Sequence, residues 1–95
     1  MNEFKPFEAS IKWIKKETRD TFTCGLKILN RDIAKRYTFR PGQFNMLYMP
    51  GTGESPISIS SSPDDQELTH TIRIAGDVTT KISRLKEGDV IGIRG

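Results

Sequence analysis

The chain has 95 residues, which is enough for one small domain with a single core and too few for two. Its 15 Lys and Arg outnumber its 12 Asp and Glu, and the charges are spread along the chain instead of forming the long blocks typical of disordered tails. Residues 1–7 lack the apolar segment of a secretion signal, and no apolar run approaches the length that spans a bilayer. We therefore expect a cytoplasmic protein without membrane insertion.

Cys24 and His70 are the only residues of their kinds. A single cysteine excludes an internal disulfide and any cysteine-rich zinc or iron–sulfur site within this chain. The sequence has no convincing local signature of a Ser–His–Asp triad. Any redox activity must therefore be carried by a bound cofactor.

The first part of the chain predicts a β-hairpin. Residues 10–16 alternate in polarity, residues 17–20 form a charged turn, and residues 21–29 have apolar side chains two residues apart. Residues 30–36 are charged and predict a loop, and residues 43–49 predict a strand after the turn signal Pro41–Gly42.

The second part of the chain predicts shorter strands. Residues 50–56 are expected to form a flexible connection, followed by a strand at 57–61 and a clearer strand at 69–75. Residues 90–93 predict the last strand. Short strands separated by Gly and Pro, without long helices, indicate a closed or partly closed antiparallel barrel.

One short helix is predicted by apolar residues at positions i, i+4 and i+7, which share a helix face: Val78, Ile82 and Leu85. Asp77 or Thr79 can cap its start, and Gly88 can end it in the left-handed conformation. At barely two turns, this helix must be held by the packing of its apolar face.

Three segments are candidates for chemistry. Residues 41–44, Pro–Gly–Gln–Phe, are a turn leading into a strand, a pattern found in almost any β protein. Residues 55–63 carry serines at alternate positions and extra hydroxyls at the end. Small hydroxyl side chains let a flat ring lie close to the backbone, and a hydroxyl serves flavin N5 as donor or acceptor. The pattern alone favours an edge strand with a solvated serine face.

The third segment, residues 72–80, is a strand, a glycine and a helix start. Free backbone N–H groups and the positive end of the helix dipole make it a candidate anion site, although the pattern alone favours an ordinary connection. If Asp77 caps the helix, its carboxylate occupies the N–H groups that a phosphate would use. Arg73 would then supply the compensating charge.

In this order, the three segments resemble the FAD domain of the ferredoxin–NADP reductase superfamily. The likeness runs from about Ser10 to Gly95, includes residues 85–89 and 91–95, and is closest to electron-transfer subunits. These are the gamma subunit of multi-subunit hydrogenases, the B subunit of anaerobic sulfite reductase and the electron-transfer subunit of dihydroorotate dehydrogenase. The resemblance implies an all-β fold, a six-stranded antiparallel Greek-key barrel with one short helix.

The resemblance also implies roles for individual residues. The family's flavin motif, Arg–x–Tyr–Ser, falls on residues 55–58, so Ser58 would lie near flavin N5 and Ile57 would cover the ring in place of an aromatic side chain. Ser55 stands where an arginine usually binds the pyrophosphate. The family's Gly–x–x–Ser/Thr phosphate loop falls on residues 76–79. No catalytic or metal-binding residue is predicted, and the predicted cofactor-binding residues are Ser55, Pro56, Ile57, Ser58, Ile72, Arg73, Gly76, Val78, Thr79 and Thr80.

The function implied by the resemblance is that of a flavin-binding module in an NAD(P)H-linked oxidoreductase. It would pass electrons between a nicotinamide nucleotide and an iron–sulfur partner, a hydrogenase or reductase catalytic subunit, through FAD or, alternatively, FMN. We expect residues 1–95 to form the FAD domain, with the NAD(P)-binding domain absent after Gly95. NAD(P)H would then bind only to the complete protein, and this chain alone would not turn it over.

The alternative is a small basic β-barrel that binds nucleic acid or a protein partner without catalysis. Such a protein would use a basic surface and stacking aromatic side chains: Lys12, Lys15, Lys16, Lys27 and Arg31, with Trp13, Phe44 and Tyr48. Against it, the aromatics can simply be core, and surface lysines are usually solvated. We therefore expect no nucleic-acid partner, and the sequence leaves the oligomeric state open.

Overall fold

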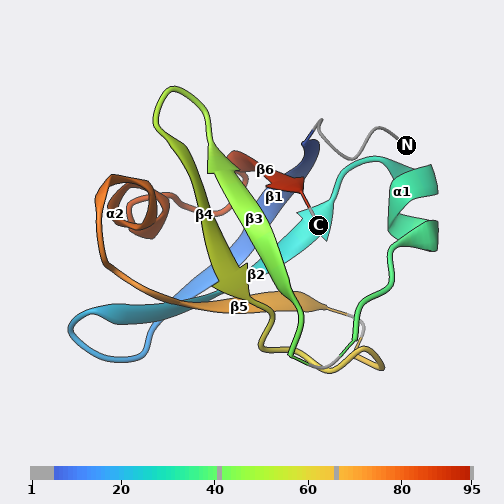
Figure 1. Ribbon diagram of the computed structural model, residues 1–95, viewed down its shortest axis with the longest axis horizontal. Helices are drawn as coiled ribbons and strands as arrows, with labels where there is room; N and C mark the ends of the chain where they lie inside the picture. The colour runs from blue at the N-terminus through green and yellow to red at the C-terminus, as the bar shows by residue number, and fades with distance from the viewer. Residues whose placement is uncertain (1–5, 41, 66, 95) are drawn as a thin grey trace.

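The computed structural model describes residues 6–40, 42–65 and 67–94 (Figure 1). Six strands and two short helices follow one another as β1 (Phe7–Lys16), β2 (Thr21–Ile28), α1 (Arg31–Arg36), β3 (Phe44–Met49), β4 (Gly53–Ser58), β5 (Leu68–Arg73), α2 (Asp77–Ser83) and β6 (Val90–Arg94). No helix within these ranges is both long and apolar enough to cross a membrane.

The six strands form one antiparallel sheet in the order β4-β3-β6-β1-β2-β5. Among the described residues, the segment just after β4 meets β5 through an isolated bridge between Ile59 and His70 and a 2.9 Å hydrogen bond from the Ser60 N–H to the Thr69 carbonyl. The sheet therefore curls into a barrel that is not closed by a complete ladder. The predicted all-β barrel of six antiparallel strands is confirmed.

The core is formed by the inward faces of the strands, because alternate side chains of each strand point to the same side. Phe22, Cys24 and Leu26 of β2 are buried, as the two-residue spacing predicted. Ile82 of α2 is fully buried, and Val78 and Leu85 pack against the core beside it. The hydrophobic effect of this burial holds a helix too short to be stable alone.

The predicted hairpin of β1 and β2 is present, with one irregularity. The register shifts between Ile11 and Trp13, so Lys12 is the extra residue of a bulge. The ring of Trp13 then lies over Gly25, where an added Cβ would come within 2.4 Å of its Nε1. A side chain at position 25 would displace the tryptophan.

The prediction of a loop at residues 30–36 was wrong, because α1 forms there. The Asn30 side chain caps this helix by accepting a 3.0 Å hydrogen bond from the Ile33 N–H. Asp32 in the first turn and Lys35 and Arg36 in the last complement the helix dipole. The fold thus has two short helices where one was predicted, and Figure 1 shows them at opposite ends of the long axis.

The predicted bounds of the fourth strand were also wrong. Residues 53–56 were assigned to a flexible connection, yet β4 begins at Gly53 and ends at Ser58. Pro56 does not prevent this, because β4 is the outer strand of the sheet order and proline is tolerated on such strands. The turn before it contains Gly51, whose φ of 80° favours glycine.

Both predicted ends of the second helix need correction. Gly76 occupies the N-cap position of α2 without a side-chain cap, so neither Asp77 nor Thr79 has the predicted role. The helix ends at Ser83 with Arg84 as its C-cap, before Gly88. Gly88 has a φ of 95° and lies within the turn that leads to β6.

Candidate functional site

The outer face of the β3–β4 pair carries the predicted flavin serine. Ser58 is exposed and lies opposite Phe44 in the antiparallel ladder, and the Phe44 side chain is 55% exposed. Cross-strand partners have neighbouring Cβ atoms and project to the same side of a sheet. A hydroxyl and an aromatic ring therefore stand side by side at one edge of the barrel.

The other residues of the predicted flavin motif alternate along β4. Pro56 is exposed on the same side as Ser58, and Ser55 is half-buried opposite Leu47. Ile57 is only 8% exposed and belongs to the core. Because its side chain points into the core, only the backbone of Ile57 lies near the outer surface of the strand.

The predicted phosphate segment surrounds the start of α2. Gly76 is exposed, with a φ of 114° that other residues rarely adopt. The buried Thr79 hydroxyl accepts a 2.7 Å hydrogen bond from the Ala75 N–H and donates to the Gly76 carbonyl at 3.3 Å. Thr79 thus shapes the turn, while Val78 and Thr80 are half-buried on α2.

α2 packs against β3 and β4, close to the first residue of β4. A Cβ added to Gly53 would lie 3.7 Å from Cγ2 of Val78. Gly53 and Ser58 are five strand steps apart, which is roughly 16 Å at the usual rise per residue. The start of α2 and the Phe44–Ser58 pair are therefore separated along β4 and are not in direct contact.

A further polar atom near this region was not singled out in the sequence. The Thr52 hydroxyl, next to Gly53, is buried and has no hydrogen-bond partner within the described part of the chain. Buried polar atoms without a partner are rare and costly. The β3–β4 turn therefore retains hydrogen-bonding capacity beside α2.

The two predicted residues on β5 have different environments. Ile72 is fully buried, so only its backbone is available to a ligand. The Arg73 side chain is 79% exposed and lies 3.8 Å from an oxygen of Asp20. An ion pair this long and exposed is weak, so Arg73 is free to bind another anion.

The fold is that of the flavin-binding barrels of reductases. A ferredoxin NADP+ reductase from Neisseria gonorrhoeae, solved with bound FAD and NADP, superposes with a TM-score of 0.77 at 23% identity, covering 92% of this chain and 35% of that one. The cytochrome b5 reductase domain of Ulva prolifera nitrate reductase has a TM-score of 0.80 at 13% identity, covering 100% and 41%. Identities this low show the fold alone.

Proteins of similar sequence show more specifically what this chain is related to. Sulfhydrogenase 2 subunit gamma of Pyrococcus furiosus is 40% identical over 95 residues, all of this chain and 33% of that protein. Sulfhydrogenase 1 subunit gamma of the same organism is 51% identical over 65 residues, 67% of this chain and 22% of that protein. A protein of Methanocaldococcus jannaschii named "Probable dihydroorotate dehydrogenase B (NAD(+)), electron transfer subunit" is 41% identical over 63 residues, 66% of this chain and 23% of that protein.

The chain is therefore a relative of hydrogenase gamma subunits and of dihydroorotate dehydrogenase electron-transfer subunits, with the fold of the FAD-binding domain of the ferredoxin–NADP reductase superfamily. The resemblance inferred from the sequence is confirmed. The chain spans a third or less of the length of these relatives. No protein-family profile matches it.

The residues able to do chemistry unaided are few. Among the described residues, no three His, Cys, Asp or Glu side chains are grouped as a metal site. Burial raises the pKa of Cys24 to about 12, so its thiol is an inert part of the core. Burial lowers the pKa of His70 to about 4, so its buried ring is neutral.

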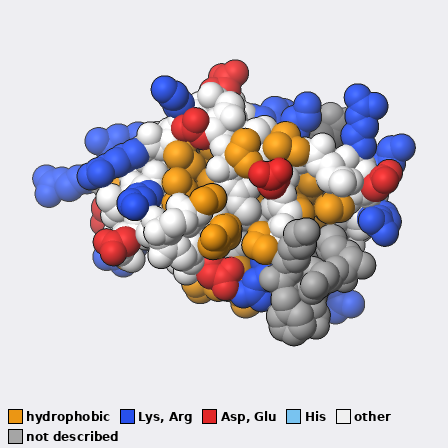
Figure 2. All heavy atoms as spheres, turned by 90° about the horizontal axis from the view of Figure 1, so that it is seen from above, with side chains coloured by type: hydrophobic (Ala, Val, Ile, Leu, Met, Phe, Trp, Pro, Cys, Tyr) orange, Lys and Arg blue, Asp and Glu red, His pale blue; other side chains and the backbone are white. Residues whose placement is uncertain are grey.

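The residues of the alternative basic surface do not form one binding face. Lys15 and Lys16 pair with residues at the start of β2, whereas Lys27 lies near its other end. Trp13 is half-buried, with its ring over Gly25 and its Nε1 donating a 3.0 Å hydrogen bond to Glu67. In the face shown in Figure 2, hydrophobic side chains gather in the middle and Lys and Arg lie mainly at the two ends. This arrangement offers no continuous basic track for nucleic acid on that face.

Proposed function

We propose that this chain is the flavin-binding module of an NAD(P)H-linked electron-transfer subunit, located in the cytoplasm, and that it holds FAD in preference to FMN. Residues 1–95 would be the FAD domain, with the nicotinamide nucleotide bound by another domain of the complete protein. In that protein, bound FAD would accept hydride and release electrons singly to an iron–sulfur partner, a hydrogenase or reductase catalytic subunit.

The observation that carries this proposal is the exposed pair of Phe44 and Ser58 on the same β3–β4 hairpin that α2 contacts at its other end. Phe44 presents apolar surface to a flat ring. The Ser58 hydroxyl can donate to or accept from N5 of that ring, as its oxidation state requires. In FAD the ring and the diphosphate are joined by a ribityl chain, so they would occupy different positions along β4.

The residues around α2 fit a diphosphate. The helix has no side-chain cap, so Asp77 does not occupy the N–H groups that a phosphate oxygen would use. Gly76 allows close approach of a ligand, and Val78, Thr79 and Thr80 supply the first turn. Arg73, three residues before Gly76, would add the positive charge that Ser55 lacks. Pro56, Ile57 and Ile72 would contribute through their backbone and by holding their strands.

Titration of the purified chain with FAD, followed by absorbance, tests this proposal. We expect saturable binding with a flavin spectrum distinct from that of free FAD, and no NADH-dependent reduction of an added dye by the chain alone. Absence of FAD binding would refute the flavin module. Robust dye reduction would instead refute the assignment of the nicotinamide site to another domain.

A further inference from the structure

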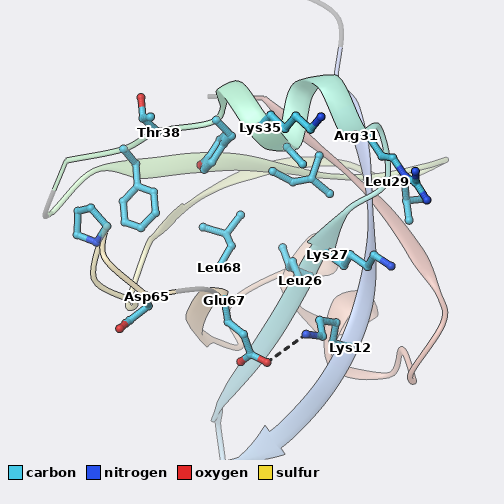
Figure 3. Close-up of a pocket in the computed structure, with 15 residues that line it drawn as sticks. Lys12, Leu26, Lys27, Leu29, Arg31, Lys35, Thr38, Asp65, Glu67 and Leu68 are labelled. Carbon is cyan, nitrogen blue, oxygen red and sulfur yellow. Dashed lines mark hydrogen bonds and ion pairs between the residues drawn. The ribbon is translucent and has the colours of Figure 1, made fainter.

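A pocket of about 770 Å³ lies between α1, β2 and the segment that leads into β5 (Figure 3). We call it the α1 pocket. α2 lies at the opposite end of the long axis from α1 (Figure 1), and none of the residues that line the pocket belongs to the proposed flavin site. The walls of the pocket combine charged side chains with an apolar part formed by Leu26, Ile28, Leu29, Tyr37, Phe39 and Leu68.

The aromatic wall of the α1 pocket is held in place by its neighbours. The Tyr37 hydroxyl accepts a 2.7 Å hydrogen bond from Nδ2 of Asn45, and its ring packs edge-on against Phe7 at 5.9 Å. Phe39 lies 6.0 Å from Tyr37, between ring centroids. Leu29 is 44% exposed, so apolar surface remains accessible to a ligand. The pocket is therefore formed in the folded chain without a partner present.

The two carboxylates at the pocket accept hydrogen bonds from neighbouring groups. An oxygen of Asp65 accepts a 2.8 Å hydrogen bond from the Ser62 N–H. The carboxylate of Glu67 accepts from Trp13 and forms an ion pair with Lys12 at 3.3 Å. Lys12 matches the charge of Glu67, whereas Asp65 keeps its negative charge, so the lining carries four cations against two carboxylates.

Three other cations line the pocket on one side. Lys27, Arg31 and Lys35 extend along the side formed by β2 and α1 (Figure 3). No carboxylate in the described ranges lies within ion-pair distance of any of the three. The pocket therefore combines an accessible apolar surface with an excess of positive charge, carried by Lys27, Arg31 and Lys35 along one side.

We propose that the α1 pocket docks an acidic segment of a partner protein. One apolar or aromatic side chain of that segment enters the pocket, and neighbouring carboxylates pair with Lys27, Arg31 and Lys35. Apolar burial supplies the affinity, while the charges set the orientation and the association rate. Nucleic acid is the poorer match, because a phosphate backbone needs a continuous basic track, whereas Lys15 and Lys16 lie toward the opposite end of the β1–β2 hairpin.

Selection from a random library of 12-residue peptides displayed on phage tests the docking proposal with the 95-residue chain as bait. We expect enrichment of peptides that carry Asp or Glu beside Leu, Ile or an aromatic residue. Their synthetic forms should bind less tightly as salt rises, and a twelve-nucleotide oligothymidylate should not displace them. No enrichment, enrichment of basic peptides, or displacement by the oligonucleotide would each overturn the proposal.

Charge reversal then locates the binding surface. The variant Lys27→Glu/Arg31→Glu/Lys35→Glu should lose at least roughly tenfold in affinity for the selected peptides, and Leu29→Ser should also weaken them. The matched control is Lys15→Glu/Lys16→Glu/Arg19→Glu, which makes the same change of charge on exposed residues near the β1–β2 turn. An equal loss of peptide affinity in the control would show that the peptides do not bind at the α1 pocket. FAD affinity should be the same in the wild-type chain and in the two pocket variants, which separates failure of docking from failure of flavin binding.

Discussion

Phe44 and Ser58 face each other across the β3–β4 ladder, and both are exposed to solvent. Together they offer an apolar ring face and a hydrogen-bonding group to a flat ligand. The predictions for flavin binding follow from this pair.

Replacing Ser58 by Ala should leave the fold intact, because its side chain lies outside the core. The loss of one hydrogen bond, about 0.5–1.5 kcal/mol, should weaken FAD binding roughly two- to twelvefold or shift the flavin reduction potential. Flavin titration and redox potentiometry measure both quantities. Unchanged affinity together with an unchanged potential would remove Ser58 from the site.

Replacing Phe44 by Ala should weaken binding of FAD and riboflavin to a similar extent, because the isoalloxazine ring is common to both. We expect a loss of about tenfold, or roughly 1.4 kcal/mol, when the ring loses its apolar neighbour. Leu29→Ala is the matched control, since Leu29 is also a large exposed apolar residue but lines the α1 pocket. A similar loss of flavin affinity in that control would indicate a general effect on the protein.

Replacing Arg73 by Ala should weaken FAD far more than riboflavin, because only FAD carries the diphosphate. A charge-assisted contact of about 1.5–3 kcal/mol corresponds to a loss of roughly ten- to 150-fold. Isothermal titration with the two ligands gives the comparison, and Arg84→Ala is a control that removes the same charge from an exposed residue beyond α2. Parallel losses for FAD and riboflavin would argue against a phosphate role for Arg73.

His70 should make stability depend on pH. Burial lowers its pKa from 6.5 to about 4, so the folded state favours the neutral ring. Its contribution is fully present above pH 6.5 and declines as pH falls toward 4, by at most about 3 kcal/mol. Nε2 of the ring lies 3.2 Å from Nδ2 of Asn45, which can donate a hydrogen bond to it. The side-chain oxygen of a Gln at position 70 can accept the same hydrogen bond. The free energy of unfolding of His70→Gln, measured with denaturant, should lack this part of the decline with falling pH. An identical pH dependence in the variant and the original chain would contradict the assignment of the decline to His70.

Gly25→Ala should destabilise the fold by about 1–3 kcal/mol, because the added Cβ would lie within 2.4 Å of Trp13 Nε1. Displacement of the only tryptophan should also shift its fluorescence, since the Nε1 bond to Glu67 would be lost. In a Trp13→Ala background the same substitution should cost far less, as measured by urea unfolding followed by circular dichroism. An equal cost in both backgrounds would locate the strain elsewhere.

Much of the fold was accessible from the order of residues. Regular alternation over β2 and β5 predicted both strands, since their buried faces repeat every second residue whatever the rest of the chain does. The i, i+4, i+7 spacing likewise predicted α2. α1 has no buried residue and so no apolar period, although the Asn30 cap followed by Asp32 was a signal that could have revealed it.

The sequence by itself determined the β architecture and the positions of the serine and glycine motifs, because these depend on local spacing. The family was inferred from the resemblance of these motifs to those of known reductases. Only the tertiary structure decided that Ile57 and Ile72 face the core, that Phe44 faces solvent beside Ser58, and that α2 contacts the opposite end of the same strand. Tertiary packing also gathered the three cations of the α1 pocket, Lys27, Arg31 and Lys35, around apolar walls. The register and curvature of the sheet settle which side of each strand is buried and which distant residues become neighbours, and these depend on contacts made across the whole barrel.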